Sequence, residues 1–223
     1  MDTTRLYLIR HGATKSVAED RFSGGSEVDL SEEGRWQAAC LAKRLADDHI
    51  SAFYCSPLGR AVETAAIISN PYQITPTQRD GLREIHHGHW ESLTRAEVER
   101  QFPEEYRSWQ EDPFTFAPTG GESGVMVMAR ALPVIREIVV NHAGQSVAVV
   151  SHKATIRLIL CSLLGFDARG YRDRLDQSPA CLNIIDFKDP VRARLMLFND
   201  VSHYVDQPPY DGSRLSKWFD RVK

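Results

Sequence analysis

The sequence predicts an α/β fold built as a three-layer αβα sandwich, with a mostly parallel central sheet and helices on both faces. Short apolar runs of strand length alternate with longer segments in which apolar residues recur at helical spacing. The run at 147–150 (VAVV) is continuously apolar, as is typical of a central parallel strand. The chain shows no internal repeat and no linker-like stretch, so we expect one domain over residues 1–223.

The strands are expected where apolar or β-branched runs meet turn residues. They are predicted at 5–10, 51–55, 147–150, 181–187 and 193–198. The first ends at His11-Gly12, where a glycine suits a tight turn. Asp189-Pro190 separates the last two strands, which we expect to pair as a hairpin.

The first helix is predicted to begin after Ser31, which is typical of an N-cap and is followed by acidic residues. Apolar residues then recur at i, i+3, i+4 and i+7. Further helices are predicted at 58–68, 94–101, 104–110, 122–142 and 154–164. We interpret 85–123 as a helical insertion that roofs the site and 208–223 as a loosely held tail.

Composition and charge exclude several classes of partner. The net charge is −3 and the pI is about 6.2, so no global basic field favours nucleic acid or a membrane surface. The sequence has no signal-peptide pattern at its N-terminus and no apolar run of the roughly 20 residues that span a bilayer. The four cysteines form no CxxC pair, which favours free thiols in a reducing compartment. We therefore expect a cytoplasmic protein.

Three segments that carry arginine or histidine each follow a predicted strand. They are Arg10-His11-Gly12, the stretch 55–64 that contains Arg60, and Ser151-His152. Ligands of such folds bind at the carboxyl ends of the strands, so these side chains are expected to converge at one edge of the sheet. Two arginines and two histidines there predict a pocket for a dianion, because guanidinium groups match phosphate oxygens in a bidentate geometry.

These motifs, with two further elements, resemble the histidine phosphatase (phosphoglycerate mutase-like) superfamily. The resemblance extends from about residue 5 to 165, and its five elements occur in the family's order: Arg10-His11-Gly12, Ser56-Pro57-x-x-Arg60-Ala-x-Glu-Thr64, Glu84, Gly120-Gly121-Glu122-Ser123 and Ser151-His152. It implies a phosphoglycerate mutase-like fold and an enzyme that needs no cofactor and no metal.

The resemblance also implies a role for each matching residue. His11 would attack phosphorus and carry the phosphoryl group as phosphohistidine. Arg10 and Arg60 would hold the phosphoryl oxygens, and His152 would donate a further hydrogen bond. Glu84 would protonate the leaving oxygen and later activate water.

The expected substrate contacts are assigned less directly. Thr14, Ser23 and Gly24 match positions at which the family contacts phosphate, and His87 is expected in the substrate pocket because 84–90 resembles some phosphoserine phosphatases of the family. Lys153 stands where the family has a small residue and Val17 where it usually has asparagine. Lys153 could replace that phosphate contact or point to solvent.

A metal site is not expected at the histidines of segment 86–89. Their spacing is not that of a helical i, i+4 pair, and no cysteine or aspartate is close in sequence.

The leading functional hypothesis is hydrolysis of a small phosphorylated metabolite, such as phosphoserine, phosphoglycerate or α-ribazole phosphate. Segment 21–24 also resembles phosphoglycerate mutases, but between Glu84 and Gly120 the only arginines are Arg95, Arg100 and Arg107, which favours water as the phosphoryl acceptor. A phosphoprotein phosphatase and a non-catalytic phospholigand binder remain as alternatives. Family analogy also suggests a homodimer.

Overall fold

The computed structural model describes residues 3–15 and 21–205. Val17 and the predicted tail at 208–223 lie outside the described residues. Within them, six strands form one sheet in the order β3-β2-β4-β1-β5-β6. The strands are β1 (Thr4–Arg10), β2 (Ile50–Cys55), β3 (Thr77–Gln78), β4 (Ser146–Ser151), β5 (Leu182–Phe187) and β6 (Ala193–Asp200).

The sheet is mostly parallel, as predicted. β1 and β2 each pair in parallel with β4, and β3 pairs in parallel with β2. β5 runs antiparallel to β1, and β6 antiparallel to β5, which confirms the predicted hairpin. In this register Arg10 lies opposite Ser151, and Cys55 lies opposite Val150. The three strands therefore end at the same edge, where the predicted site residues begin.

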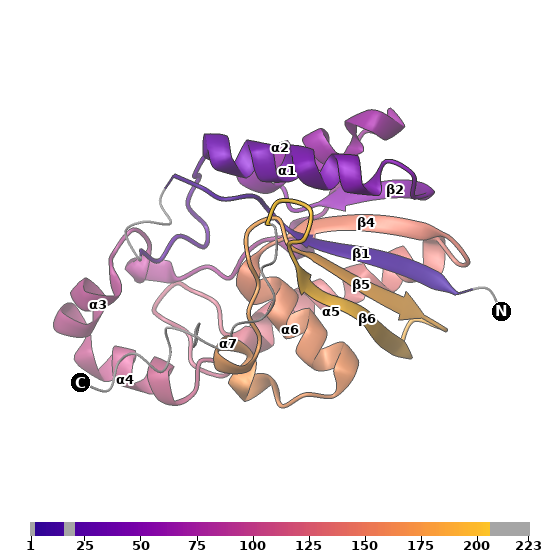
Figure 1. Cartoon of the computed structure of the whole chain (residues 1–223). Helices are drawn as coiled ribbons and strands as arrows, with labels where there is room; N and C mark the ends of the chain where they lie inside the picture. Colours follow the sequence, from indigo (N-terminus) through magenta and orange to yellow (C-terminus); the bar gives the residue numbers. More distant parts are fainter. Residues whose placement is uncertain (1–2, 16–20, 206–223) are drawn as a thin grey trace, which may run out of the picture.

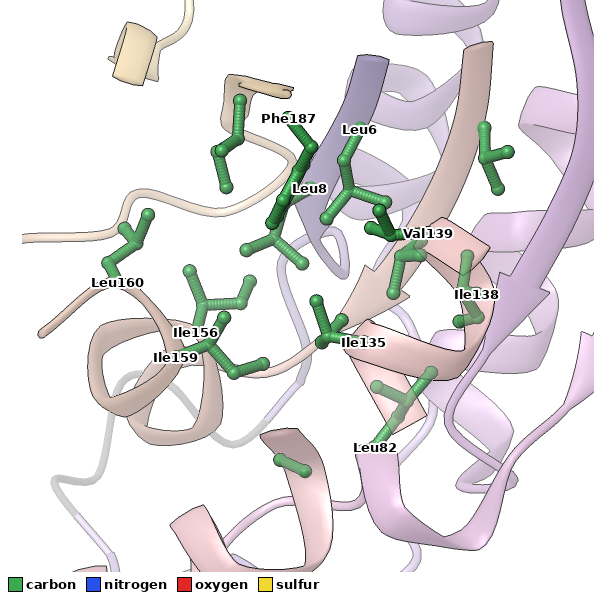
Figure 2. Packing of buried hydrophobic residues seen from close by; sticks show 14 residues of the cluster. Leu6, Leu8, Leu82, Ile135, Ile138, Val139, Ile156, Ile159, Leu160 and Phe187 are labelled. Carbon is green, nitrogen blue, oxygen red and sulfur yellow. The ribbon is translucent and has the colours of Figure 1, made fainter. Parts of the chain in front are cut away.

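Helices cover both faces of the sheet (Figure 1). α1 (Glu32–Leu45) and α2 (Gly59–Ser69) pack on one face, and α5 (Gly124–Asn141) and α6 (Lys153–Leu164) on the other. The alternation of side chains along β1 explains the two faces, because Tyr7 and Ile9 contact the first pair, whereas Leu6 and Leu8 contact the second (Figure 2). The three layers predicted from the sequence are thus confirmed. None of the helices in the described part of the chain is long and apolar enough to cross a membrane.

A smaller aromatic cluster lies beyond the strand ends. α3 (Arg95–Gln101) and α4 (Pro103–Glu111) pack with Trp90 and Phe22 around it. Figure 1 shows these helices at the end of the molecule away from the N-terminus. Thr94 and Glu97 form a capping box that begins α3, and Pro103 occupies the first turn of α4, where its missing N–H costs nothing.

Short helical segments complete the described chain. They are α7 (Tyr171–Arg174) and the 3-10 turns η2 (Asn70–Tyr72), η3 (Asp80–Leu82), η4 (Gly88–Trp90) and η5 (Ala168–Gly170). The sequence did not predict α7, β3 or these turns. Each has at most four residues, so none is long enough to show a hydrophobic period.

Candidate active site

His11 is fixed at the sheet edge by its backbone. Its N–H donates to the carbonyl of Ser151 on β4 at 3.0 Å, and its own carbonyl accepts from Ala180 at 3.0 Å. Gly12 then lets the chain pass close to α1, because a Cβ at this position would lie 2.4 Å from the carbonyl oxygen of Gly34. The Gly12 N–H donates to the Thr64 hydroxyl at 3.2 Å. The motif residues Gly12 and Thr64 therefore hold the loop that carries His11.

The His11 imidazole is neutral and has a defined tautomer. Its Nδ1 lies 2.8 Å from the carbonyl oxygen of Gly12, and because a carbonyl can only accept, Nδ1 carries the proton. Nε2 is left with its lone pair. Burial lowers the pKa of His11 well below its usual value, and the positive charges of Arg10 and Arg60 lower it further. A neutral imidazole with a free Nε2 is the form that attacks an electrophile.

His152 lies beside His11, with ring centroids 5.0 Å apart. Its side chain is fully buried, and within the described residues neither ring nitrogen has a hydrogen-bond partner. Burial lowers the pKa of His152 well below the usual value, and the nearby His11 adds to this effect. His152 is thus an uncharged ring with unused polar atoms next to His11.

Arg10 and Arg60 flank His11 from different elements. Arg60, in the first turn of α2, donates to the carbonyls of Ser26 and Gly24, each at 2.8 Å. Arg10, the last residue of β1, donates to the carbonyl of Gln177 at 2.6 Å, while its buried Nε has no partner among the described residues. Burial lowers the pKa of each guanidinium, but from so high a starting value that both stay charged.

Glu84 is held at the N-terminus of α6. Its carboxylate accepts from the backbone N–H groups of Ala154 and Thr155, both at 3.2 Å, and from the Thr155 hydroxyl at 3.2 Å. Arg130 fixes the backbone here by donating to the Glu84 carbonyl at 3.0 Å. Arg130 is itself paired with Glu122 of the Gly-Gly-Glu-Ser motif at 2.8 Å. The motif at 120–123 therefore acts by positioning the segment that carries Glu84.

The loop at 23–26 is tied to His87 through Glu91. One oxygen of the Glu91 carboxylate accepts from Gly25 at 3.0 Å and from the His87 N–H at 2.8 Å, and the other accepts from the Ser26 hydroxyl at 2.7 Å. These hydrogen bonds lower the pKa of Glu91 against the opposing effect of burial, so it remains a carboxylate. Glu91 was not singled out from the sequence.

These residues surround one cavity of about 280 Å³. Nine of the ten predicted site residues line it: Arg10, His11, Thr14, Ser23, Gly24, Arg60, Glu84, His87 and Lys153. His152 is not among the residues that line it, although its ring lies beside that of His11. The cavity is strongly basic. Among the described residues, Glu84 is the only carboxylate on its wall, whereas seven cationic side chains line it: Arg10, Arg21, Arg60, Arg95, Lys153, Arg157 and Arg172. Such a cavity suits an anion.

The histidines of segment 86–89 diverge in the structure. His87 lines the cavity, His86 accepts a hydrogen bond from the Gly88 N–H at 2.9 Å, and His89 lies 3.1 Å from the Glu105 carboxylate. In the described part of the chain, no three His, Cys, Asp or Glu residues are grouped as metal ligands would be.

The comparison with known families agrees with this geometry. The family model of the histidine phosphatase superfamily, branch 1, matches residues 6–201. The chain belongs to this superfamily. Phosphoserine phosphatase 1 of Hydrogenobacter thermophilus is 36% identical over 163 residues, which cover 73% of this chain and 77% of that protein.

Solved structures of the superfamily share the fold. Bacillus stearothermophilus YhfR is 34% identical with a TM-score of 0.84, over 90% of this chain and 98% of that one. A mycobacterial glucosyl-3-phosphoglycerate phosphatase is 30% identical with a TM-score of 0.80, over 88% of this chain and 99% of that one. The histidine phosphatase domain thus accounts for most of the chain.

Sequence reasoning missed part of the cavity wall. Arg157 and the Tyr171–Arg172 pair line the cavity but were not predicted as site residues. Arg157 could have been found, because it lies one helical turn after Lys153 on the helix that follows Ser151-His152. Tyr171 and Arg172 could not, since α7 is too short and too polar to predict.

The buried histidines predict acid sensitivity. Between pH 6.5 and 5 the unfolded chain binds protons at histidine, whereas His11 and His152 stay neutral in the fold because their pKa values are lowered. We therefore expect the free energy of unfolding to fall by up to about 1.4 kcal/mol per pH unit for each of them. Denaturant unfolding at several pH values checks this. In His152→Asn the slope of the free energy of unfolding against pH should be smaller by the amount that corresponds to about one proton. An unchanged slope in the variant would contradict the assignment.

Proposed function

We propose that this protein hydrolyses a small phosphomonoester in two steps through a phosphohistidine at Nε2 of His11. The observation that carries the proposal is the state of His11, which is neutral, protonated at Nδ1 and lines a basic cavity together with Arg10 and Arg60. The names of the similar proteins, a phosphoserine phosphatase and a glucosyl-3-phosphoglycerate phosphatase, support the same reaction class.

In the first step the Nε2 lone pair of His11 attacks phosphorus, and the bond from phosphorus to the ester oxygen breaks. Arg10 and Arg60 donate to the phosphoryl oxygens and stabilise the charge that develops on them. The leaving oxygen takes a proton from Glu84, which the first turn of α6 holds in place. The product alcohol then leaves, and the phosphoryl group remains on His11.

In the second step water attacks the phosphohistidine. The Glu84 carboxylate accepts the proton of the water molecule, the P–N bond breaks, and its electron pair returns to Nε2. Inorganic phosphate leaves, and Glu84 is protonated again for the next turnover. Thr14, Ser23, Gly24 and His87 lie on the same cavity wall and provide further substrate contacts.

The substrate is a small molecule in this proposal, because a cavity of about 280 Å³ lies at the small end of the range for ligand pockets. We further propose that residues 1–223 act as one catalytic domain and that segment 85–123, which supplies Ile85, His87, Arg95 and Trp109 to the wall, roofs the site.

Phosphate release in the presence of EDTA tests the proposal. We expect chelator-resistant hydrolysis of p-nitrophenyl phosphate and of at least one ester among phosphoserine, 3-phosphoglycerate and α-ribazole phosphate, because arginines supply the positive charge. Phosphoryl transfer that requires a sugar-acid acceptor, without release of phosphate, would instead identify a mutase.

A further inference from the structure

Lys153 and Arg157 form a pair of cations that the two-step reaction does not use. They are four residues apart on α6, so they share one face of the helix, and both line the cavity. Both also contact the same carboxylate. The Asp176 Oδ1 atom lies 3.2 Å from the Lys153 amine and 3.1 Å from the Arg157 guanidinium. A carboxylate therefore fits between these two side chains.

Asp176 alone does not satisfy the hydrogen-bond donors and the positive charges of Lys153 and Arg157. The Arg157 residue is 9% exposed, and its Nε has no hydrogen-bond partner among the described residues. The Asp176 side chain, by contrast, is 66% exposed at the rim. Burial lowers the pKa of Lys153, and the positive charges of Arg157 and Arg10 lower it further. A mostly buried guanidinium whose only hydrogen-bond partner among the described residues is an exposed aspartate, beside a second cation, is a site that can bind an anion.

Arg172, which lines the same cavity, differs from Arg157 because its guanidinium is fully engaged in contacts within the protein. Its guanidinium lies 4.4 Å from the ring centroid of Trp109 and donates to the carbonyls of Trp109 and Gln110 at 3.3 and 3.2 Å. It also pairs with Asp173. Arg172 thus builds the wall, whereas the only hydrogen-bond partner of Arg157 among the described residues is the exposed Asp176.

The pair lies on the side of the cavity where the leaving group departs. Glu84, which protonates the leaving oxygen in the proposed reaction, is bound by the N–H groups of Ala154 and Thr155 in the same turn of α6 that carries Lys153. A group attached to the leaving oxygen therefore comes next to Lys153 and Arg157. In the proposed reaction Arg60, together with Ser23 and Gly24 of the cavity wall, contacts the phosphoryl group instead.

We propose that Lys153 and Arg157 form a subsite for a carboxylate on the leaving group, so that the preferred substrates are phosphorylated hydroxy or amino acids. This inference rests on the proposed phosphatase reaction and states which substrates that reaction prefers. Asp176 occupies the subsite from the rim when no substrate is bound, and the carboxylate of the substrate competes with it.

Two matched substrate pairs test the subsite. 3-Phosphoglycerate and glycerol 3-phosphate differ by a carboxylate in place of a hydroxymethyl group, and phosphoserine differs from phosphoethanolamine by its carboxylate alone. We expect kcat/KM to favour the acid by tenfold or more in at least one pair, mostly through KM, because charge-assisted hydrogen bonds are strong. Arg157→Met should reduce that preference by about tenfold, and Lys153→Met, at a more exposed position, should also reduce it.

Asp176→Asn distinguishes binding from a structural role. If Arg157 only anchored Asp176, Asp176→Asn and Arg157→Met would lose activity to the same extent. If the subsite binds the substrate, Asp176→Asn should lower KM for the acid or leave it unchanged, while Arg157→Met raises it. Arg136→Met on the exposed face of α5 is the control for loss of a surface arginine and should change neither substrate pair.

The two proposals fail in different ways. Hydrolysis of p-nitrophenyl phosphate with equal kcat/KM for acid and non-acid esters would overturn the subsite and leave the phosphatase intact. Absence of hydrolysis would overturn the phosphatase, and calorimetric titration of His11→Asn with 3-phosphoglycerate and glycerol 3-phosphate then still tests the subsite. Tighter binding of the acid that is lost in the His11→Asn/Arg157→Met double variant supports it, and equal binding contradicts it.

Discussion

His11→Ala is expected to reduce phosphate release by about four orders of magnitude or more, because it removes the atom to which the phosphoryl group is transferred. The arginines would still bind the ester, so KM should change far less than kcat. Phosphate release from p-nitrophenyl phosphate measures the effect.

His49→Ala serves as the matched control, since His49 is exposed and precedes β2, at the end of the sheet away from the cavity. It should retain the activity of the unchanged protein. His11→Ala should keep a cooperative unfolding transition, because the substitution removes a neutral ring from a cavity wall. Substantial turnover by a folded His11→Ala protein would rule out the phosphohistidine reaction.

Glu84→Gln should have the second-largest effect, and its size should depend on the leaving group. For an alkyl phosphate such as glycerol 3-phosphate we expect kcat to fall by about 10²- to 10⁴-fold, since the alkoxide cannot leave without a proton. p-Nitrophenolate leaves without one. The first step with p-nitrophenyl phosphate should therefore stay fast, while the second, which needs a base for water, becomes slow.

The expected signature is a burst of one p-nitrophenolate per Glu84→Gln molecule, followed by slow turnover. Stopped-flow absorbance measures it, with Glu99→Gln on the exposed face of α3 as the control. Equal losses for alkyl and nitrophenyl esters, with no burst, would show that Glu84 does not act as an acid. Glutamine keeps one of the two oxygens that accept from the first turn of α6, and the Arg130 hydrogen bond to the carbonyl of residue 84 is unaffected, so the local fold should survive.

The fold could be predicted where a buried element appears in the sequence as a run of apolar residues. β1 and β4 are buried on both faces, so their apolar runs identified them to within a residue or two. The helix predicted at 94–101 is α3, which the structure shows to begin with a capping box of Thr94 and Glu97. β3 has two exposed residues and was missed, because its pairing with β2 depends on a distant partner.

The site shows the same division between local and distant causes. Arg10, His11 and Arg60 could be predicted because each lies at or after the end of a strand, and strand ends meet at one edge of a parallel sheet. The clamp of Glu91 on the loop at 23–26 joins positions more than 60 residues apart, and no spacing indicates it. Asp176 likewise meets Lys153 only through the fold.

The structure also shows that the arginines between Glu84 and Gly120 are not the main source of positive charge in the cavity. Between Glu84 and Gly120, of the three arginines only Arg95 reaches the cavity wall, but Arg157 and Arg172 arrive from beyond the predicted roof. The cavity is therefore more basic than that segment alone indicated. In the proposed reaction Arg157 lies on the leaving-group side, where it would favour an acidic leaving group.

The phosphoenzyme itself gives the most direct test of the reaction. Glu84→Gln is mixed with p-nitrophenyl phosphate, quenched during the burst under alkaline conditions that preserve phosphohistidine, and digested for mass spectrometry. We predict one phosphoryl group on the peptide that contains His11, and none when His11→Ala is combined with Glu84→Gln. A phosphoryl group on another residue, or a full burst with no covalent adduct, would contradict transfer through His11.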